Sequence, residues 1–229
     1  MIKGFFVTGT DTDIGKTYVC RQLADAFAQF LPVTYAKPIQ TGCEKAGDGA
    51  LRSPDFDYVM AGEARMTASY DEHVPYRFEP ACSPHLAAQI ADEQIQIPLI
   101  AQSMEIVSRG VDCTIVEGAG GILVPLNQNQ YMLDLMNVIK LPVILVTSPR
   151  LGTLNHTFLS YQSLRRNQIT VAAVVFNEPV AAEHDFIFED NRVTIERTIA
   201  PTPLFSIAYG DCFSPKLVEF CHDLAQRFL

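Results

Sequence analysis

The sequence predicts an α/β fold built on a doubly wound, mostly parallel sheet with helices on both faces. Short apolar runs alternate along the chain with segments of helical periodicity, which is the order that builds a parallel sheet. Several of these runs are apolar on both faces, as expected of strands that helices cover on both sides. The strands are predicted at residues 4–7, 33–36, 113–116, 143–147, 171–176 and 204–207.

Helices are predicted between and after these strands. Apolar residues recur at helical spacing over 19–30 and over 154–164, which indicates one buried face on each helix. The segments 83–91 and 214–228 each begin with Ser-Pro, which is typical of an N-cap followed by proline at the first helical position. Strand and helix therefore alternate over most of the chain.

The composition indicates one domain, over residues 1–229. Its 48% hydrophobic residues suffice for a core, and a net charge of −9 without a Lys/Arg stripe argues against nucleic-acid binding. No apolar stretch reaches the roughly 18 residues of a membrane span, and no signal peptide is recognised. The six cysteines are scattered without a C-x-x-C pair, so we expect reduced thiols and a cytoplasmic protein.

Residues 8–17 read TGTDTDIGKT and directly follow the first predicted strand. The pattern predicts a tight turn and then a helix that opens near Gly15, so that turn amides and the helix N-terminus face an anion. Lys16 adds a full positive charge, and the hydroxyl of Thr17 can hold a magnesium ion. These features predict a phosphate-binding loop for a nucleoside triphosphate, and with it a fold of the P-loop NTPase type.

The loop departs from the regular pattern G-x-x-x-x-G-K-[ST]. Gly9 lies six residues before Gly15, which is one residue too far. Thr10 occupies the place where the partitioning-type ATPases carry a second lysine. Asp11 and Asp13 put negative charge beside a phosphate site; either they face a second, positively charged ligand, or they cap the turn.

Two further candidate regions follow the strand at 33–36. Ligands of such sheets bind at the carboxyl ends of the strands, and Lys37 is the first residue beyond this one. It can neutralise charge that develops on a phosphate or a carboxylate, or it can simply reach solvent. Thr41 offers a hydroxyl in the same loop. Asp55 and Asp57 are candidate magnesium ligands, with helix capping as the alternative.

Glu117 follows the strand at 113–116 and precedes Gly118, Ala119 and Gly120. An acidic residue at the end of a core strand is a Walker-B-like arrangement that holds Mg²⁺ directly or through water. An unpaired carboxylate at a buried strand end is costly without a cation. The neighbouring glycines would let backbone amides line a pocket.

The last three strand ends are also candidates. Gly152 and Thr153 open a helix whose free amides suit an anion such as a substrate carboxylate, or they form only a capped βα turn. Asn177 ends the next strand, where its amide can pair with a base edge or form an Asx-type turn. Residues 208–210 follow the last strand and would form a wall of the base pocket.

Seven sequence blocks follow one another between residue 4 and about residue 210: TGTDTDIGKT, AKPIQTG, LRSPD, SPH, VEGAGG, PVILVTSPRLGTLNH and VVFN. Together they closely resemble the dethiobiotin synthetases, the ATP-dependent ligases that close the ureido ring in biotin biosynthesis. The resemblance implies that 7,8-diaminononanoate reacts with CO₂ to give a carbamate, which attacks the γ-phosphate of ATP. Ring closure then gives dethiobiotin, ADP and phosphate. It also implies a homodimer.

The resemblance implies a role for each candidate residue. Lys16 and Lys37 are the catalytic residues, of which Lys16 contacts the phosphates and Lys37 stabilises the carbamate and the transferring phosphoryl group. The magnesium ligands are Thr17, Asp55 and Glu117. The substrate-binding residues are Thr12, Thr41, Gly152, Thr153 and Asn155, the last three acting in the other subunit's site. The ATP-binding residues are Asp13, Ile14, Gly15, Lys16, Thr17, Tyr18, Asp55, Glu117, Gly118, Ala119, Gly120, Asn177, Glu178, Ala208, Tyr209 and Gly210.

Three departures from the family pattern stand out. Asp13 replaces a more common glutamate, Thr41 replaces a common serine, and the region 178–203 aligns poorly. The main alternative function is a nucleotide-switch ATPase of the partitioning or metallochaperone type, against which Thr10 counts. A cobyrinate-type amide synthetase would need an added glutaminase domain, for which 229 residues are too few.

Overall fold

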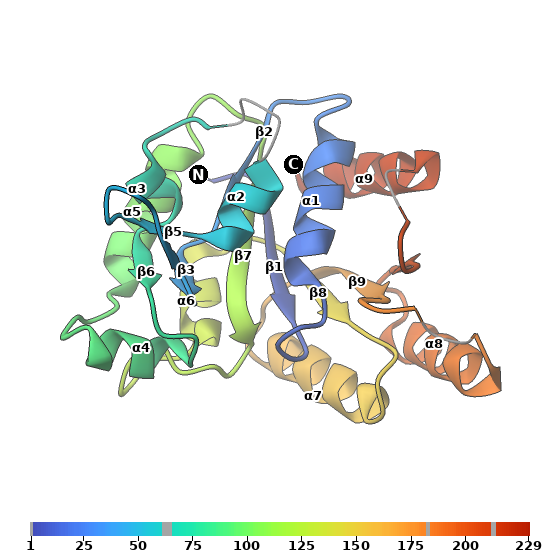
Figure 1. Cartoon of the computed structure of the whole chain (residues 1–229). Helices are drawn as coiled ribbons and strands as arrows, with labels where there is room; N and C mark the ends of the chain where they lie inside the picture. Colours follow the sequence, from blue (N-terminus) through green and yellow to red (C-terminus); the bar gives the residue numbers. More distant parts are fainter. Residues whose placement is uncertain (1, 61–65, 182–183, 212–213) are drawn as a thin grey trace.

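A six-stranded sheet organises the computed structural model, which describes residues 2–60, 66–181, 184–211 and 214–229 (Figure 1). The strand order is β10-β9-β8-β1-β7-β2, and every neighbouring pair is parallel. All six strands predicted from the sequence are present, which confirms the doubly wound α/β class. They are β1 (Gly4–Gly9), β2 (Val33–Ala36), β7 (Cys113–Gly121), β8 (Val143–Thr147), β9 (Val171–Asn177) and β10 (Leu204–Ile207).

Strand β1 lies in the middle of the sheet, between β7 and β8. Successive side chains of a strand point to opposite faces. Phe5 and Val7 accordingly pack into one apolar cluster, and Phe6 packs into the other. The run Gly-Phe-Phe-Val is therefore apolar throughout because each face of β1 is buried under a separate layer of helices.

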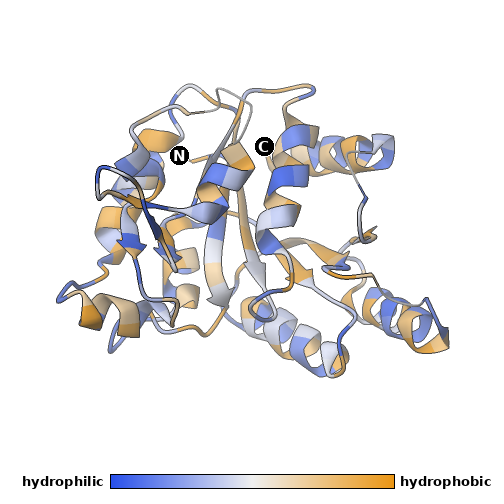
Figure 2. Cartoon of the chain, viewed as in Figure 1, coloured by the Kyte–Doolittle hydropathy of each residue, from blue (hydrophilic) through white to orange (hydrophobic). Residues whose placement is uncertain are grey.

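Helices cover the sheet on both sides, and each carries hydrophilic and hydrophobic residues (Figure 2). One layer comprises α1 (Lys16–Phe27), α2 (Pro54–Met60) and α9 (Pro215–Phe228). The other comprises α5 (Ile97–Val107), α6 (Met132–Ile139), α7 (Thr153–Arg166) and α8 (Phe186–Ile199). Within the described part of the chain, no helix combines the length and apolarity needed to cross a membrane.

Several short elements between β2 and α5 were not predicted. They are β3 (Ile39–Thr41), β4 (Glu44–Lys45), β5 (Leu51–Arg52), α3 (Tyr70–His73) and β6 (Tyr76–Phe78), whereas α4 (Pro84–Ile90) was expected. Strands β3 and β6 form a parallel pair, and β4 and β5 form an antiparallel one. Figure 1 shows this group beside the β2 edge of the sheet, where it forms one side of the site described below.

The structure corrects one predicted boundary. Strand β7 does not end at Val116 but continues to Gly121, which pairs with Gly9 of β1, so Glu117 lies inside a strand rather than at its end. The extension was missed because its residues are mostly glycine, which has low strand propensity. The first helix begins at Lys16, directly after its N-cap Gly15, as the loop pattern predicted.

The described cysteines form no disulfide with one another, as the scattered spacing predicted, and Cys212 lies outside the described residues.

Candidate active site

The phosphate loop connects β1 to α1 in the predicted order. Gly15 is the N-cap of α1 and has a left-handed backbone with φ of 84°. A Cβ atom at this position would lie 2.2 Å from Nδ2 of Asn177. Glycine is therefore required both by the left-handed backbone and by the close approach of Asn177. Lys16 is buried, and its Nζ donates to the backbone oxygen of Asp11 at 2.8 Å. The lysine thus folds back over its own loop.

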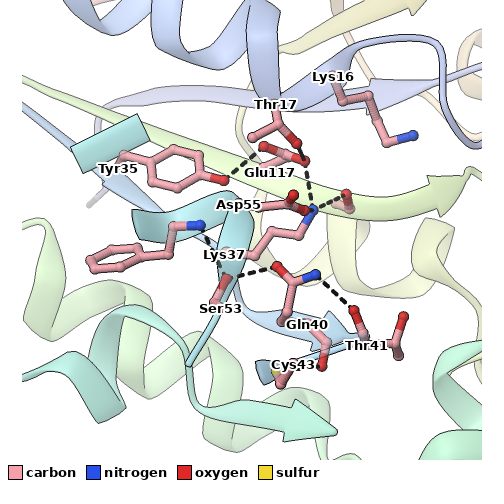
Figure 3. Close-up of polar contacts among 12 residues, drawn as sticks. Lys16, Thr17, Tyr35, Lys37, Gln40, Thr41, Cys43, Ser53, Asp55 and Glu117 are labelled. Carbon is pink, nitrogen blue, oxygen red and sulfur yellow. Dashed lines mark hydrogen bonds and ion pairs between the residues drawn. The ribbon is translucent and has the colours of Figure 1, made fainter. Parts of the chain in front are cut away.

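Lys37 lies at the centre of a cluster of charged groups (Figure 3). Its Nζ is 2.5 Å from Oε1 of Glu117 and 2.8 Å from Oδ2 of Asp55. Thr17 donates its hydroxyl to the same Oε1 of Glu117 at 2.9 Å. Only 3% of Lys37 is exposed, so the alternative in which it reaches solvent is wrong. The sequence predicted that a buried Glu117 needs a cation. In the structure the ammonium of Lys37 neutralises this carboxylate.

Of the two aspartates near the start of α2, only one faces this cluster. Burial alone would raise the pKa of the Asp55 carboxyl, but the charge and hydrogen bond of Lys37 lower it below its ordinary value. Asp57 instead forms an exposed ion pair with Arg52, at 2.9 Å. The Asp11 carboxylate accepts from the backbone N–H of Thr12 at 2.7 Å, which supports the turn-capping alternative for that residue.

The two lysines experience opposite electrostatic environments. Burial and the nearby charge of Lys37 lower the pKa of Lys16 to about 8. Burial also acts to lower the pKa of Lys37, but Glu117 and Asp55 outweigh it and raise that pKa above its ordinary value. Both lysines are mainly protonated at neutral pH, but Lys16 loses its proton as the pH rises through about 8, whereas Lys37 keeps its proton.

Four residues of the site were missed by the sequence reasoning. Tyr35 donates its hydroxyl to Oε2 of Glu117 at 2.7 Å. Gln40 accepts from Ser53 at 2.7 Å and donates to the backbone oxygen of Thr41 at 2.8 Å. The remaining residue is Arg150, whose guanidinium donates to the backbone oxygen of Asp13 at 2.8 Å. The available signal was their position: each lies inside or directly before one of the blocks quoted above.

A cavity of about 640 Å³ opens in front of these groups, a volume typical of small-molecule sites. Its lining includes most residues predicted for phosphate, metal and substrate: Thr12, Asp13, Gly15, Lys16, Thr17, Lys37, Thr41, Asp55, Glu117, Ala119 and Gly120. The rest of the lining includes Ile39 and Gln40 of β3 and residues 81–84, where α4 begins. Residues from distant parts of the sequence therefore converge on one space.

The residues predicted for the base lie elsewhere, beyond Gly15. Glu178 donates its backbone N–H to Ile207 at 3.0 Å, which brings the ends of β9 and β10 together. Asn177 is fully buried and donates its Nδ2 to the backbone oxygen of Ile14 at 2.8 Å. Its Oδ1 has no hydrogen-bond partner among the described residues. The Asn177 side chain therefore uses its N–H group to bind the phosphate loop, while its Oδ1 acceptor has no partner among the described residues.

The residues predicted for the substrate carboxylate are also separate from the cavity. Thr153 is buried, and its hydroxyl bonds to that of Thr147 at 3.1 Å. Asn155 is exposed at the start of α7, and the preceding Leu151 projects fully into solvent. Although Gly152, Thr153 and Asn155 are all described, they do not line the 640 Å³ cavity of their own chain.

Known proteins share this sequence and this geometry. A family model described as AAA domain matches residues 3–204. The ATP-dependent dethiobiotin synthetase BioD of Aeromonas hydrophila is 40% identical over 180 residues, which are 77% of this chain and 78% of that protein. The enzyme of the same name from Pseudomonas aeruginosa PAO1 is 37% identical over 202 residues, 86% of each chain. The chain belongs to the dethiobiotin synthetase family. This confirms the resemblance found in the sequence blocks.

Solved structures with lower identity share the fold. A ParA family ATPase from Chlorobium tepidum superposes with a TM-score of 0.56 at 13% identity, over 99% of this chain and 90% of that chain. The septum site-determining protein MinD of Pyrococcus horikoshii, solved with Mg-ADP, gives 0.56 at 18% identity, over 98% and 86%. These neighbours confirm the P-loop NTPase type of fold for this dethiobiotin synthetase family member.

Proposed function

We propose that this chain is an ATP- and Mg²⁺-dependent ligase that makes dethiobiotin from 7,8-diaminononanoate, CO₂ and ATP in biotin biosynthesis. The observation that carries the proposal is the position of Lys37. Its ammonium lies between Asp55 and Glu117, beside the phosphate loop and on the wall of the cavity. A chain that only binds nucleotide has no need of a second buried lysine from another loop. A chain that transfers a phosphoryl group to a bound carbamate does.

The donor set fits Mg²⁺. The hydroxyl of Thr17 and the carboxylates of Asp55 and Glu117 are hard oxygen ligands, and they meet around one positive charge, the ammonium of Lys37. A site that already accommodates a cation is suited to a divalent one. Bound there, Mg²⁺ would neutralise charge on the β- and γ-phosphates of ATP.

The chain's own residues supply the rest of the phosphate site. The amide of Gly15 and the N-terminus of α1 point fixed dipoles at the β- and γ-phosphates. Lys16 would leave the carbonyl of Asp11 and turn to the phosphate oxygens, whose negative charge stabilises its protonated form. Arg150 holds the backbone of Asp13 in place, which keeps the loop in a binding conformation.

The substrate supplies both nucleophiles. One amine of the diamine attacks CO₂ and loses a proton, which forms the carbamate. A carbamate oxygen then attacks the γ-phosphorus and displaces ADP, while Lys37 stabilises the negative charge shared between the two groups. The second amine attacks the activated carbonyl carbon and expels phosphate, which closes the ring. Thr12 and Thr41 line the cavity on two sides and would hold the diamine or its carbamate.

A homodimer would complete the site. At this helix N-terminus Gly152 and Asn155 are exposed, Thr153 is buried, and none of the three lines the cavity of its own subunit. Exposed Leu151 and Leu159 lie beside it, and apolar residues of this kind are typical of a subunit interface. In a two-fold dimer this helix end would face the partner's cavity and bind the substrate carboxylate there.

The base site is supported by the free acceptor of Asn177. Its Oδ1 has no partner among the described residues, and it suits the exocyclic amine of adenine. The ends of β9 and β10, with Ala208, Tyr209 and Gly210, would form the wall around the ring. This placement would put the base on the far side of Gly15 from the diamine.

The test is whether ATP consumption requires both the diamine and CO₂. Purified protein is incubated with ATP and Mg²⁺, with and without 7,8-diaminononanoate and bicarbonate, and ADP and dethiobiotin are measured together. We expect both products only when both substrates are present. Strong ATPase activity without the diamine would favour the nucleotide-switch alternative.

A further inference from the structure

One tyrosine in the apolar core is aimed at the candidate metal site. Tyr35 lies in β2 and is fully buried in the cluster beneath α1 and α2. Its ring stacks on that of Phe56, with centroids 5.9 Å apart. Its hydroxyl leaves this apolar environment and donates to Oε2 of Glu117 at 2.7 Å (Figure 3).

The register of the sheet creates this contact. Tyr35 lies opposite Ile115 in the parallel pairing of β2 and β7. Glu117 is two residues beyond Ile115 and so lies on the same face of the sheet. Because neighbouring strands are about 5 Å apart, the long phenol side chain spans the distance from β2 to the carboxylate.

The two oxygens of Glu117 have separate partners. Oε1 accepts from Lys37 and Thr17, which line the cavity, and Oε2 accepts from Tyr35, which lies in the core. A carboxylate held at only one oxygen can rotate about its last bond. Held at both, it keeps a fixed plane, with one particular oxygen facing the cavity.

The tyrosine hydroxyl has a cost that a phenylalanine would avoid. Burying a hydroxyl in an apolar core is unfavourable unless it finds a hydrogen-bond partner. Here the partner is an acceptor-only carboxylate. The phenol is therefore the donor of this bond, and the carboxylate is its acceptor.

We propose that Tyr35 is a positioning residue that orients the Glu117 carboxylate so that Oε1 faces the metal and the phosphates. The inference rests on the proposed function only in that Glu117 holds a divalent cation with the nucleotide. Residues that orient a metal ligand typically change metal affinity or activity by about 10–100-fold when they are removed.

The experiment measures metal binding without turnover. Mn²⁺ is titrated into wild type and Tyr35→Phe in the presence of a non-hydrolysable ATP analogue, and free Mn²⁺ is followed by electron paramagnetic resonance. We expect Tyr35→Phe to bind Mn²⁺ about 10-fold more weakly, with unchanged affinity for the analogue in the absence of metal. Replacing the hydroxyl with an amino group, as p-aminophenylalanine at position 35, keeps a donor in place and should restore most of the affinity.

Tyr161→Phe is the matched control. Tyr161 is also a buried tyrosine, and its hydroxyl donates to the backbone oxygen of Ile199 at 3.1 Å in the opposite helical layer. We expect this variant to bind Mn²⁺ like the wild type. Wild-type Mn²⁺ affinity in Tyr35→Phe, or an equal loss in both variants, would overturn the proposal.

The result separates this inference from the proposed function. If wild type binds Mn²⁺ with the analogue and Tyr35→Phe weakens it, the positioning role stands even if no dethiobiotin is formed. If wild type forms dethiobiotin and Tyr35→Phe binds Mn²⁺ normally, the function stands and the positioning role fails. Absence of Mn²⁺ binding in the wild type would overturn the metal role of Glu117 and the inference with it.

Discussion

The ammonium of Lys37 lies 2.5 Å from Oε1 of Glu117, and both side chains are almost completely buried. The pair joins the end of β2 to the middle of β7, directly beside the phosphate loop. A lysine held this way cannot act on a substrate until its carboxylate partners are satisfied by something else. A divalent cation at the same carboxylates would do that and release the ammonium toward the cavity.

Lys37→Ala should lower turnover by about 10²–10³-fold, as is usual when charge stabilisation of a transition state is lost. The rate of dethiobiotin formation at saturating substrates measures the effect. Lys45→Ala is the control, because Lys45 is exposed and forms a surface ion pair with Glu79. Near-normal turnover in Lys37→Ala would show that its charge does not act on the reacting groups.

Lys37→Met should make stability depend on magnesium. Removing the lysine leaves buried Glu117 and partly exposed Asp55 without their cation, and breaking a buried pair from one side costs about 3–5 kcal/mol. Mg²⁺ should recover part of this loss, whereas it should affect the wild type less. Urea unfolding with and without Mg²⁺ gives both values, and an identical effect of Mg²⁺ on the two proteins would contradict the shared site.

Nucleotide affinity should decrease as the pH rises above about 8. In the empty protein the pKa of Lys16 is lowered to about 8, and a bound triphosphate raises it again. Binding therefore takes up a proton above that pH, and affinity falls by at most about tenfold per pH unit. Below about pH 7, Lys16 is charged in both states and no uptake is expected. Calorimetry in buffers of different ionisation enthalpy measures the proton directly.

Lys16→Arg provides the comparison, because arginine stays protonated throughout this range. Its residual nucleotide affinity should be independent of pH between 7 and 9.5, in contrast to the wild type. A wild-type affinity that is equally flat would mean that Lys16 is fully charged in the empty site.

Gly15→Ala should weaken nucleotide binding more than Gly49→Ala, a substitution that causes a similar backbone strain. Gly15 and Gly49 share the same φ of 84°, so alanine at either position carries a similar strain, about 1–3 kcal/mol. At Gly49 a Cβ meets nothing within 4 Å, whereas at Gly15 it lies 2.2 Å from Asn177. Binding of a fluorescent ATP analogue should fall only in Gly15→Ala, and equal loss in both variants would argue against the role of the Asn177 contact.

Mixed dimers should recover activity if each site uses both subunits. Lys37→Ala damages the cavity of its own subunit, and Asn155→Asp places a negative charge where the partner's substrate carboxylate would bind. In a hybrid dimer one of the two sites has neither change. An equal mixture after subunit exchange should therefore show about one quarter of wild-type activity, from two nearly inactive parents. No recovery despite exchange would mean that Asn155 acts within its own subunit or not at all.

The strands and the phosphate loop were predictable because their signals are local. Each strand of the large sheet contains a short, mostly apolar run, and the loop at 8–17 carries its own glycine, lysine and threonine. Lys37 was found because it directly follows such a run. The surroundings of Lys37 could not be predicted. Whether it is buried or reaches solvent depends on Asp55 and Glu117, which come from distant parts of the chain.

The contacts between strands needed the structure. The bond from Tyr35 to Glu117 depends on the register of β2 against β7, which no single stretch of sequence specifies. The short strands β3 and β6 are three residues long, too short for a periodic pattern, yet they place Gln40 and Thr41 in the cavity wall. The continuation of β7 over residues 118–121 was also not predicted, because this glycine-rich stretch has no alternation of hydrophobic and polar residues.

The central position of β1 also affects how the protein emerges from the ribosome. Its two neighbours, β7 and β8, follow about 100 and 130 residues later, which at ordinary rates is roughly 5–30 s of synthesis. During that interval Phe5 and Phe6 belong to a strand with both edges open and both faces bare. Until β7 and β8 have been made this segment is aggregation-prone, and the phosphate loop attached to it cannot become rigid before then.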